Sequence, residues 1–327
     1  MRRATRVSVA LCTRDGGEFV GEQLASILSQ TEPVAQIVLS DDDSSDDTVA
    51  IVERAVAAAP AASRPELLVL RNDVPLGVAA NFEQAARACT GELIAFCDQD
   101  DVWHSQKIRT LVGAFDDAAV LLAFSDARLV DAAGAPLGST MFGSLRVSAR
   151  ERRLLAEGRA FEALLGRNLV TGATTMISRR LLDVAVPFPG TWVHDEWLAA
   201  IAAATGRLVA VDQPLIDYRQ HGSNEIGAVQ AGVAATVTRA LRPLSEQLAR
   251  VVPRAESLVA ALEHLDELHP GALDAAQGKL AFERARSRFP HVRVARVPRV
   301  LAAVVCGDYR RYGRGLPDAA RDLLRPY

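Results

Sequence analysis

Apolar segments alternate with polar loops along the first part of the chain. Short β-rich apolar runs predict strands at Val7–Leu11, Ile37–Leu39, Leu67–Leu70, Leu93–Cys97 and Val120–Phe124. Between them, apolar residues at helical spacing predict helices at Phe19–Gln30, Thr48–Ala59, Ala79–Cys89 and Lys107–Phe115. This alternation predicts an α/β fold with a mostly parallel, Rossmann-like sheet and helices on both faces.

The order of elements becomes mixed after the strand at Val120–Phe124. The pattern predicts a hairpin turn at Asp131–Gly134, a charged helix at Ala149–Leu165 and a loop running into a strand at Thr171–Ser178. A second helix at Leu198–Ala204, a last strand at Leu208–Val211 and a polar loop at Tyr218–Asn224 follow. From Val229 onward the spacing is helical. We therefore predict a domain over residues 1–228 and a helical C-terminal region over residues 229–327, with the boundary near Ala228.

Composition places the chain among ordinary globular proteins. Of its 327 residues, 49% are hydrophobic and 24% charged, and the net charge of −3 argues against a nucleic-acid-binding function. The four cysteines show no C-x-x-C spacing, which favours a reducing cytoplasm. The apolar run after Arg6 is broken at Arg14 and is too short for a signal peptide, and no run approaches the roughly 18 residues of a membrane span. We expect a cytoplasmic protein that is soluble or peripheral at the inner face of the membrane.

Carboxylates follow the strand at Leu93–Cys97 directly. Asp98, Asp100 and Asp101 lie on one short turn, where like charges repel unless a cation or a proton neutralises them. A hard divalent metal, Mg²⁺ or Mn²⁺, is the natural counter-ion. The alternative is an Asx-type turn that leads into the following helix. In open α/β sheets ligands bind at the carboxyl ends of strands, so we expect binding residues around Thr13, Asp42, Asn81 and Asp98.

Five motifs occur in an order that resembles the inverting family 2 glycosyltransferases, which have a GT-A type fold. The resemblance covers roughly residues 5–226 and is strongest to a bacterial branch that includes rhamnosyltransferases. The motifs are the Gln23–Gln30 segment with Ser26-Ile27, Ser40-Asp-Asp-x-Ser-x-Asp-x-Thr48, Asn72 with Gly77 and Asn81-Phe82, Asp98-Gln-Asp-Asp-x-Trp103, and Tyr218-Arg-x-His-x-x-Asn224.

The resemblance implies a role for each matching position. Thr13, Asp15, Asn81 and Asp98 would line the donor site, and Asp42 would accept a hydrogen bond from a pyrimidine ring. The metal ligands would be Asp98, Asp100 and His221, with Asp100 the direct ligand. Asp195 would be the catalytic base, with Glu196 the second candidate, and the acceptor side would include Thr171, Gly172, Glu196 and Trp197. Two positions depart from the pattern: Arg14-Asp15 replaces Tyr-Asn, and Asp43 replaces a Gly, so a non-glycine residue must hold that turn.

The resemblance implies a metal-dependent inverting glycosyltransferase. The donor would be dTDP-rhamnose or a UDP-sugar, and the acceptor a hydroxyl of a cell-surface polysaccharide precursor, either a glycan or a lipid-linked glycan. Two alternatives stay open: a catalytically degenerate nucleotide-sugar-binding protein, and a nucleotidyltransferase, although no Gly-rich, Lys-bearing phosphate loop lies near Thr13. Two site residues also have plain structural alternatives, His221 as a loop residue and Asp195 as a helix cap. Trp103 is expected to pack in the core and not to form a sugar platform.

Arginines accumulate at the end of the chain. After Lys279, apolar and basic residues alternate at helical spacing, which is typical of a basic amphipathic helix that lies on a membrane surface. The alternative is the solvated face of a helical subdomain. The residues concerned are Arg293, Arg296, Arg299, Arg310, Arg311 and Arg314, with Val292, Val294, Val297, Val300, Leu301 and Val304.

Overall fold

The chain forms two compact units. The computed structural model describes residues 5–222 and 244–325. The first unit comprises Met1–Ser148, Val170–Ala202 and Arg207–Ala228, and the second comprises Ala149–Leu169, Ala203–Gly206 and Val229–Tyr327. The segment Ala149–Leu169 therefore belongs with the C-terminal helices. The predicted boundary near Ala228 lies outside the described residues.

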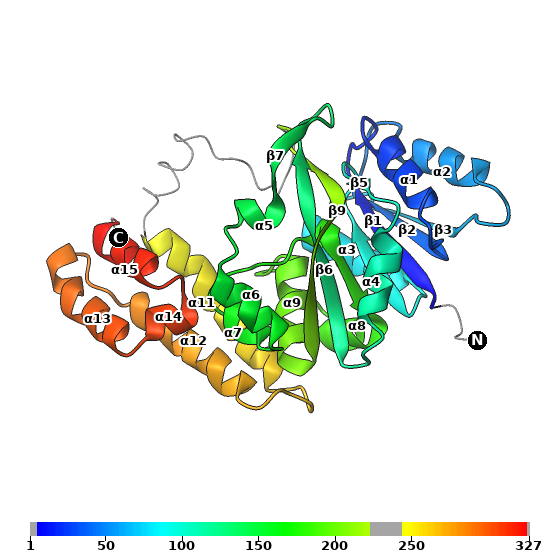
Figure 1. The fold of residues 1–327 in the computed structure, drawn as a ribbon. Coiled ribbons are helices and arrows are strands. Elements are labelled where there is room, and N and C mark those ends of the chain that lie inside the picture. Colours follow the sequence, from blue (N-terminus) through cyan, green and yellow to red (C-terminus); the bar gives the residue numbers. More distant parts are fainter. Residues whose placement is uncertain (1–4, 223–243, 326–327) are drawn as a thin grey trace. The chain divides into compact units, whose positions relative to one another are not determined.

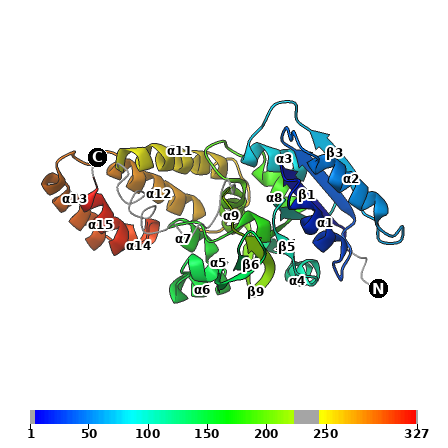
Figure 2. The same cartoon turned by 90° about the horizontal axis from the view of Figure 1, so that it is seen from above.

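Four parallel strands form the first half of the sheet, in the order β3-β2-β1-β4. They are β1 (Val7–Thr13), β2 (Gln36–Asp41), β3 (Glu66–Arg71) and β4 (Leu93–Cys97). Every residue of β1, β2 and β4 is buried, because helices cover both faces, and this explains the continuous apolar runs. Helices α1 (Val20–Leu28) and α2 (Thr48–Ala58) lie on one face and α3 (Val78–Ala88) on the other (Figures 1 and 2). The predicted elements and the α/β fold class are confirmed here.

The second half of the sheet is mixed. Strand β8 (Thr175–Ser178) lies antiparallel between β4 and β6 (Val120–Val130), and β9 (Arg207–Arg219) runs parallel to β6. Strand β5 (Val102–Trp103) pairs with β9, and β7 (Pro136–Thr140) pairs with β6, which completes a nine-stranded sheet within the described residues.

Strand β9 corrects the prediction of a short strand at Leu208–Val211. The register passes from Ser125↔Val211 to Asp126↔Pro214, so Asp212 and Gln213 form a bulge and pairing resumes beyond them. The bulge hid the continuation, because its polar residues resemble a strand end. Tyr218 and Arg219 are therefore strand residues, and the predicted polar loop starts only after them.

The remaining helices that pack around the sheet belong to the first unit, except that the last residues of α9, from Ala203 on, belong to the second. They are α4 (Lys107–Ala114), α5 (Met141–Ser144), the 3-10 turn η1 (Gly172–Thr174), α8 (Arg179–Ala185) and α9 (His194–Thr205). Helix α9 starts at His194 and not at the predicted Leu198. Its first turn therefore contains Asp195 and Glu196.

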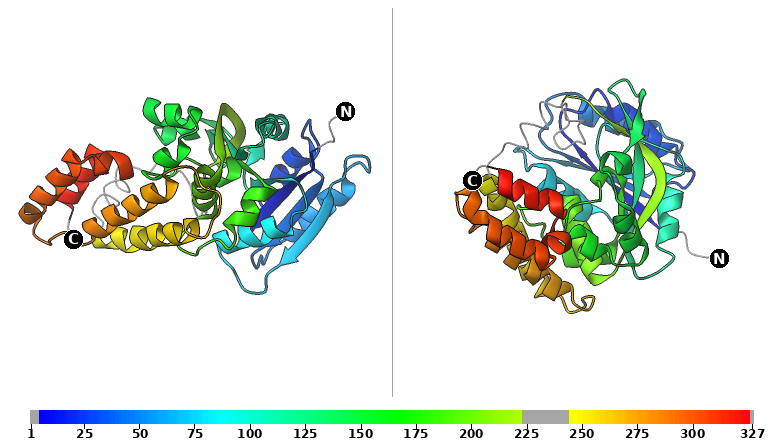
Figure 3. Two further views of the ribbon diagram at one scale, coloured as in Figure 1. Left: turned by 90° about the horizontal axis from the view of Figure 1, so that it is seen from below. Right: turned by 60° about the vertical axis from the view of Figure 1, so that its left-hand side comes forward.

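Helices make up the described part of the second unit. The predicted single helix Ala149–Leu165 is in fact two, α6 (Ala149–Ala156) and α7 (Ala160–Leu164), and Gly158 between them adopts φ 74°. The C-terminal helices, shown in yellow to red in Figure 3, are α11 (Leu244–Leu262), α12 (Ala272–Arg286), α13 (Arg293–Val305), α14 (Asp308–Tyr312) and α15 (Leu316–Leu324). None of the described helices combines the length and the apolar character needed to cross a bilayer.

Candidate functional site

The carboxyl ends of β1, β2 and β4 bring three loops together. Strand β1 pairs with β2 on one side and β4 on the other, which is the point where the strand order reverses. Open α/β sheets bind ligands in the crevice at such a point. Thr13 ends β1 and donates its hydroxyl hydrogen to Asp41 Oδ1 at 2.6 Å. The predicted binding residues at these strand ends are therefore neighbours.

Hydrogen bonds tie the loop after β1 to the other two loops. Asp15 adopts φ 44°, and its Oδ1 accepts from the backbone N–H of Ser45 at 2.8 Å and from the Ser45 hydroxyl at 3.0 Å. On the other side, the amide of Gln99 binds both the N–H and the carbonyl of Arg14, at 2.8 and 3.0 Å. Asp43 adopts φ 67°, so a non-glycine residue does hold this left-handed turn.

Asp42 and Asn81 are buried and organise the loop after β3. The Asp42 carboxylate accepts from Asn72 Nδ2 at 3.0 Å and from the backbone N–H groups of Leu76 and Gly77 at 2.7 and 2.9 Å. Asn81 exchanges hydrogen bonds with Ser40, accepting from its hydroxyl at 2.6 Å and donating to its carbonyl at 3.0 Å. A carboxylate has about four acceptor positions, so Asp42 keeps capacity for one more donor. The donor contacts of both residues stay predictions.

The aspartates after β4 form a group of like charges, in which Asp101 is buried and Asp98 and Asp100 are half-buried. Burial, followed by the negative charges of Asp100 and Asp195, raises the pKa of Asp98 to about 7. Burial and the charges of Asp100 and Asp98 also raise the pKa of Asp101. Asp101 Oδ1 accepts from the Arg219 backbone N–H at 3.0 Å, whereas Oδ2 has no hydrogen-bond partner in the described part of the chain. The fold thus holds these carboxylates together without full compensation.

His221 lies against this group. Its Nε2 is 2.8 Å from Asp100 Oδ2, and its ring stacks on Phe19 with centroids 4.8 Å apart. Of the three predicted metal ligands, Asp100 and His221 are therefore in direct contact. The charge of Asp100 in turn acts on Asp98.

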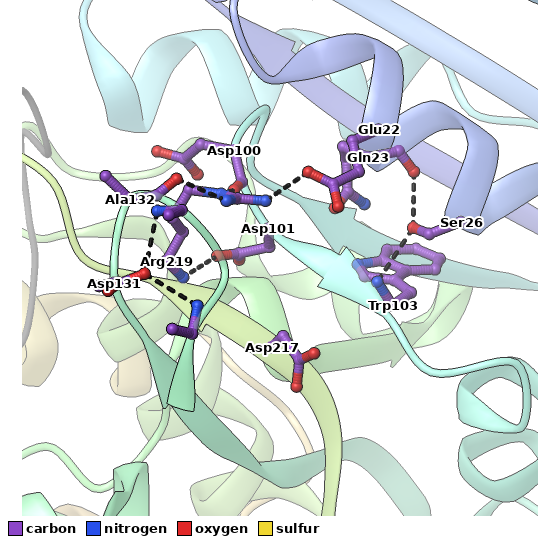
Figure 4. A network of polar contacts seen from close by, with 12 residues as sticks. Glu22, Gln23, Ser26, Asp100, Asp101, Trp103, Asp131, Ala132, Asp217 and Arg219 are labelled. Atoms are coloured by element: carbon purple, nitrogen blue, oxygen red, sulfur yellow. Dashed lines mark hydrogen bonds and ion pairs between the residues drawn. The ribbon is translucent and has the colours of Figure 1, made fainter. Parts of the chain in front are cut away.

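Arg219 positions the aspartate turn, and sequence reasoning assigned it no role (Figure 4). Its guanidinium donates to the carbonyls of Asp100 and Ala132, both at 2.8 Å, and to Glu22 Oε2 at 2.6 Å. The side chain is almost fully buried although Glu22 is exposed. The sequence signal was the Tyr-Arg pair itself, but only the extension of β9 places Arg219 beneath this turn.

Lys107 is a second charged residue that sequence reasoning missed. It is fully buried, its Nζ donates to the Ala173 carbonyl at 2.6 Å, and the same atom lies 3.6 Å from the centroid of the Trp103 ring. Burial lowers the pKa of Lys107 to about 7, although Cys97, Asp101 and Asp98 oppose this shift. Trp103 is itself buried, so it packs in the core, as the sequence predicted. Lys107 therefore contacts the η1 turn directly and acts on the aspartate group through its charge.

Asp195 is fixed by backbone donors at the start of α9. Its Oδ2 accepts from the N–H of Gly172 at 3.0 Å and its Oδ1 from the N–H of Glu196 at 2.6 Å. The Thr171 carbonyl accepts from Thr174 and Thr175, which fixes the η1 turn that presents Gly172. Because the charge of Asp195 contributes to the raised pKa of Asp98, the two carboxylates lie near each other. Asp195 lies inside the first turn of α9, so it does not cap the helix, but a carboxylate is favoured there by the helix dipole, and the residue is partly exposed.

Aromatic residues pack behind Asp195. His194 is buried between Phe82 and Phe96, with ring centroids 4.0 and 5.4 Å away, and burial lowers its pKa to about 3. Neither ring nitrogen of His194 has a hydrogen-bond partner among residues 5–222 and 244–325. Trp197 is only 2% exposed and donates to the Ala185 carbonyl at 2.7 Å. The structure thus places the Trp197 side chain in the core, whereas Glu196 is partly exposed.

A family model described as glycosyl transferase family 2 matches residues 8–184, which is more than half of the chain. The chain belongs to glycosyl transferase family 2. The matched range includes the strand ends and the aspartate turn. Asp195 and His221 lie beyond it and are placed by the structure alone.

Curated relatives of this family 2 chain match only part of it. An uncharacterised glycosyltransferase of Nostoc sp. is 27% identical over 116 residues, which are 36% of this chain and 34% of the relative. An uncharacterised protein of Mycobacterium tuberculosis is 34% identical over 123 residues, 38% of this chain and 36% of the relative. The chain thus spans about a third of the length of these relatives.

Several solved structures share the fold of this family 2 chain. S. aureus TarS 1–349 in complex with UDP-GlcNAc aligns with a TM-score of 0.56 at 18% identity, over 85% of this chain and 72% of TarS 1–349. The mannosyltransferase PcManGT from Pyrobaculum calidifontis, in complex with GDP-Man and Mn²⁺, aligns with a TM-score of 0.51 at 21% identity, over 98% of this chain and 86% of its own. At these identities the likeness establishes the fold alone.

The donor set at the aspartate turn fits a hard divalent metal. Across the described ranges, no three His, Cys, Asp or Glu side chains converge closely enough to hold a metal ion by themselves. Asp100 and His221 nevertheless meet at 2.8 Å, beside Asp98 and Asp101, whose pKa values are raised by loss of solvation and then by like charge. Magnesium is commonly bound through one or two carboxylates, with water and substrate phosphates completing the shell. A two-residue ligand pair in a family 2 glycosyltransferase is therefore compatible with a metal that binds together with a diphosphate.

Proposed function

We propose that this family 2 glycosyltransferase is a metal-dependent, inverting enzyme. It would transfer a sugar from a nucleotide-diphosphate donor to a hydroxyl group of an acceptor, with Asp195 as the general base. The observation that carries the proposal is the position of Asp195. Two backbone N–H groups hold its carboxylate in place, and its charge acts on Asp98 at the switch point of the sheet.

The proposed reaction needs a base opposite the leaving group. Asp195 would take the proton from the acceptor hydroxyl while that oxygen attacks the anomeric carbon, and the diphosphate would leave from the other side, which inverts the configuration. The N–H of Gly172 and the N–H of Glu196 would keep the carboxylate oriented. Asp98, Asp100 and His221 would hold Mg²⁺ or Mn²⁺, and the chemistry that this ion supplies is charge neutralisation at the departing diphosphate.

The donor would lie over the ends of β1 and β2, in contact with Thr13, Asp15, Asp42 and Asn81. We propose a dTDP- or UDP-sugar, with dTDP-rhamnose as the first candidate, because the remaining acceptor position of Asp42 suits the N3–H of thymine or uracil. TarS with UDP-GlcNAc and PcManGT with GDP-Man support a nucleotide-sugar donor in general. They leave the choice of base and sugar to experiment.

The acceptor would be a cell-surface polysaccharide precursor, free or linked to a lipid. It would approach over Thr171, Gly172 and Glu196. A peripheral position at the inner face of the membrane, held by the C-terminal region, would suit a lipid-linked acceptor. The buried Trp197 could then support this surface from beneath without touching the acceptor itself.

Donor identity and metal dependence can be tested together. Purified protein would be incubated with a panel of dTDP-, UDP- and GDP-sugars, with Mn²⁺, with Mg²⁺ or with EDTA, and thermal stabilisation and release of the nucleoside diphosphate would be measured. We expect one donor to stabilise the protein in the presence of metal and to be hydrolysed or transferred slowly. Full turnover in EDTA, or in Asp100→Ala, would contradict the metal role. Donor binding without any turnover, across a panel of acceptors, would favour a nucleotide-sugar-binding protein.

A further inference from the structure

Helix α13 is held in the second unit by a buried arginine. Arg296 is fully buried, and its guanidinium donates to four backbone carbonyls at 2.6 to 2.9 Å, those of Pro290, His291, Asp322 and Arg325. Val300, one turn further on, is buried on the same side. The sequence had suggested both residues for a membrane-facing surface, and this is wrong for both. Arg296 and Val300 therefore define the inward face of α13.

The opposite face of α13 is apolar and exposed. Four residues spaced by three or four positions form one stripe along the helix. This α13 stripe consists of Val294, Val297, Leu301 and Val305, which are 78%, 38%, 55% and 85% exposed. Contiguous exposed apolar surface of this kind is unusual on a monomer and marks an interaction site.

The positive charge around the α13 stripe favours an anionic partner surface over a second copy of the chain. The helix Arg293–Val305 contains no Asp or Glu, and its Arg293 and Arg299 are exposed. Arg288, Arg310 and Arg311, in the flanking segments, are exposed as well. A second copy of the chain that packed symmetrically on the stripe would bring these arginines against their own counterparts. An anionic surface is complementary to them.

We propose that the α13 stripe lies in the interface of an anionic lipid membrane, with Arg293 and Arg299 at the level of the lipid phosphates. An amphipathic helix with arginines beside an apolar face binds in this way, parallel to the surface. The proposal deepens the membrane contact named above and assigns it to one face of one helix. It does not depend on the transfer reaction, so either can fail alone.

Vesicle co-sedimentation of the full chain tests the assignment. One set of vesicles would consist of neutral phosphatidylcholine, and the other of phosphatidylcholine with roughly 30% of the anionic lipid phosphatidylglycerol. Both would be tested at about 0.05 M and about 0.5 M salt. We expect binding to the anionic vesicles at low salt and release at high salt. Arg293→Gln with Arg299→Gln should lower the partition coefficient about 25-fold, since each basic side chain contributes a factor of about five. Val294→Ser with Val305→Ser should lower it about tenfold, because the stripe would lose most of its exposed apolar surface.

Matched controls separate the stripe from the general surface. Arg54→Gln with Arg109→Gln removes two exposed arginines of the first unit, and Val74→Ser with Leu137→Ser removes two exposed apolar side chains there. We expect both controls to bind vesicles like the unchanged protein. Equal binding to neutral and anionic vesicles, or equal loss in controls and stripe variants, would overturn the proposal. Dimerisation in solution that the stripe variants abolish, without vesicle binding, would assign the stripe to a second copy instead.

Discussion

Each unit of this family 2 chain contains a cluster of buried and half-buried charged groups, and the two clusters differ in how fully partners compensate these charges. At the strand ends of the first unit, loss of solvation and then the like charges of neighbouring aspartates raise the pKa values of Asp98 and Asp101, and Asp101 Oδ2 has no partner in the described part of the chain. In the second unit, Arg286 binds Asp322 through two parallel hydrogen bonds, at 2.6 and 2.7 Å. A buried charged group therefore does not by itself indicate a functional site. A buried charged group whose charge is not fully compensated by partners does indicate one.

The second cluster is satisfied throughout. Tyr309 donates its hydroxyl hydrogen to Asp322 Oδ2 at 2.7 Å, and Arg286 also binds Glu283, which in turn pairs with Lys279. Burial alone would lower the pKa of Arg286, but hydrogen bonds to Asp322 and the charge of Glu283 outweigh it, so this pKa is raised. Such a network joins α12, α14 and α15 and has a structural role.

We expect the largest effect from a substitution of the proposed base in the first unit. Asp195→Asn keeps the shape of the side chain but loses its basicity, so we expect turnover to fall by about 10²- to 10⁴-fold. Donor binding, measured by calorimetry, should change little. Asp183→Asn, which changes an exposed carboxylate of the same unit outside the site, serves as the matched control and should keep the activity. If Glu196→Gln lost activity and Asp195→Asn kept it, the base would be Glu196.

Next in size is the loss of the structural network. Asp322→Ala leaves Arg286 buried without its partner, so we expect the free energy of unfolding to fall by about 3–5 kcal/mol. Asp266→Ala, which removes an exposed carboxylate of the same unit, should change it by less than about 0.5 kcal/mol. Denaturant unfolding followed by circular dichroism measures both. A small loss in Asp322→Ala would mean that this cluster is not structural.

A smaller effect is expected at the turn that orients the base. A Cβ on Gly172 would lie 2.6 Å from His194 Nε2, so Gly172→Ala must displace the turn or the buried ring. We expect a loss of about 1–3 kcal/mol in stability and a lower kcat, because the N–H donor to Asp195 moves. Gly190→Ala is the control, since nothing lies within 4 Å of its added Cβ. Equal kcat values for the two variants would show that the turn does not orient the base.

The two halves of the site differ in how far the sequence could predict them. Strand ends and the aspartate turn follow from apolar runs and from local motifs, so Thr13, Asp42 and Asp98 could be placed in advance. Arg219 and Lys107 act through contacts with carbonyls far along the chain, which no local pattern encodes. The continuation of β9 past its bulge was invisible for the same reason, because only pairing with β6 reveals it.

In the second unit, too, the sequence could not predict which residues depend on tertiary contacts. Arg296 shares its helical spacing with Arg293 and Arg299, so the sequence could not distinguish an anchoring arginine from exposed ones. Four backbone carbonyls supplied by the ends of neighbouring segments make the difference. Local patterns thus identified the amphipathic helix α13, whereas its inward face depended on tertiary contacts.

The most direct test of the contrast between the clusters is the free energy of unfolding as a function of pH, measured in EDTA for the unchanged protein, Asp98→Asn and Asp322→Asn. The folded-state pKa of Asp98, about 7, lies above the unfolded value of about 3.9, so the folded state binds the extra proton between these pH values. Stability should therefore fall as pH rises through this window and stay low above it. Asp98→Asn removes that loss, and at pH 8 we expect it to be more stable than the unchanged protein by about 1 kcal/mol or more. Asp322→Asn should be less stable at every pH in the window. If Asp98→Asn were as destabilised as Asp322→Asn at pH 8, the carboxylates of the site would be compensated, and the contrast would be wrong.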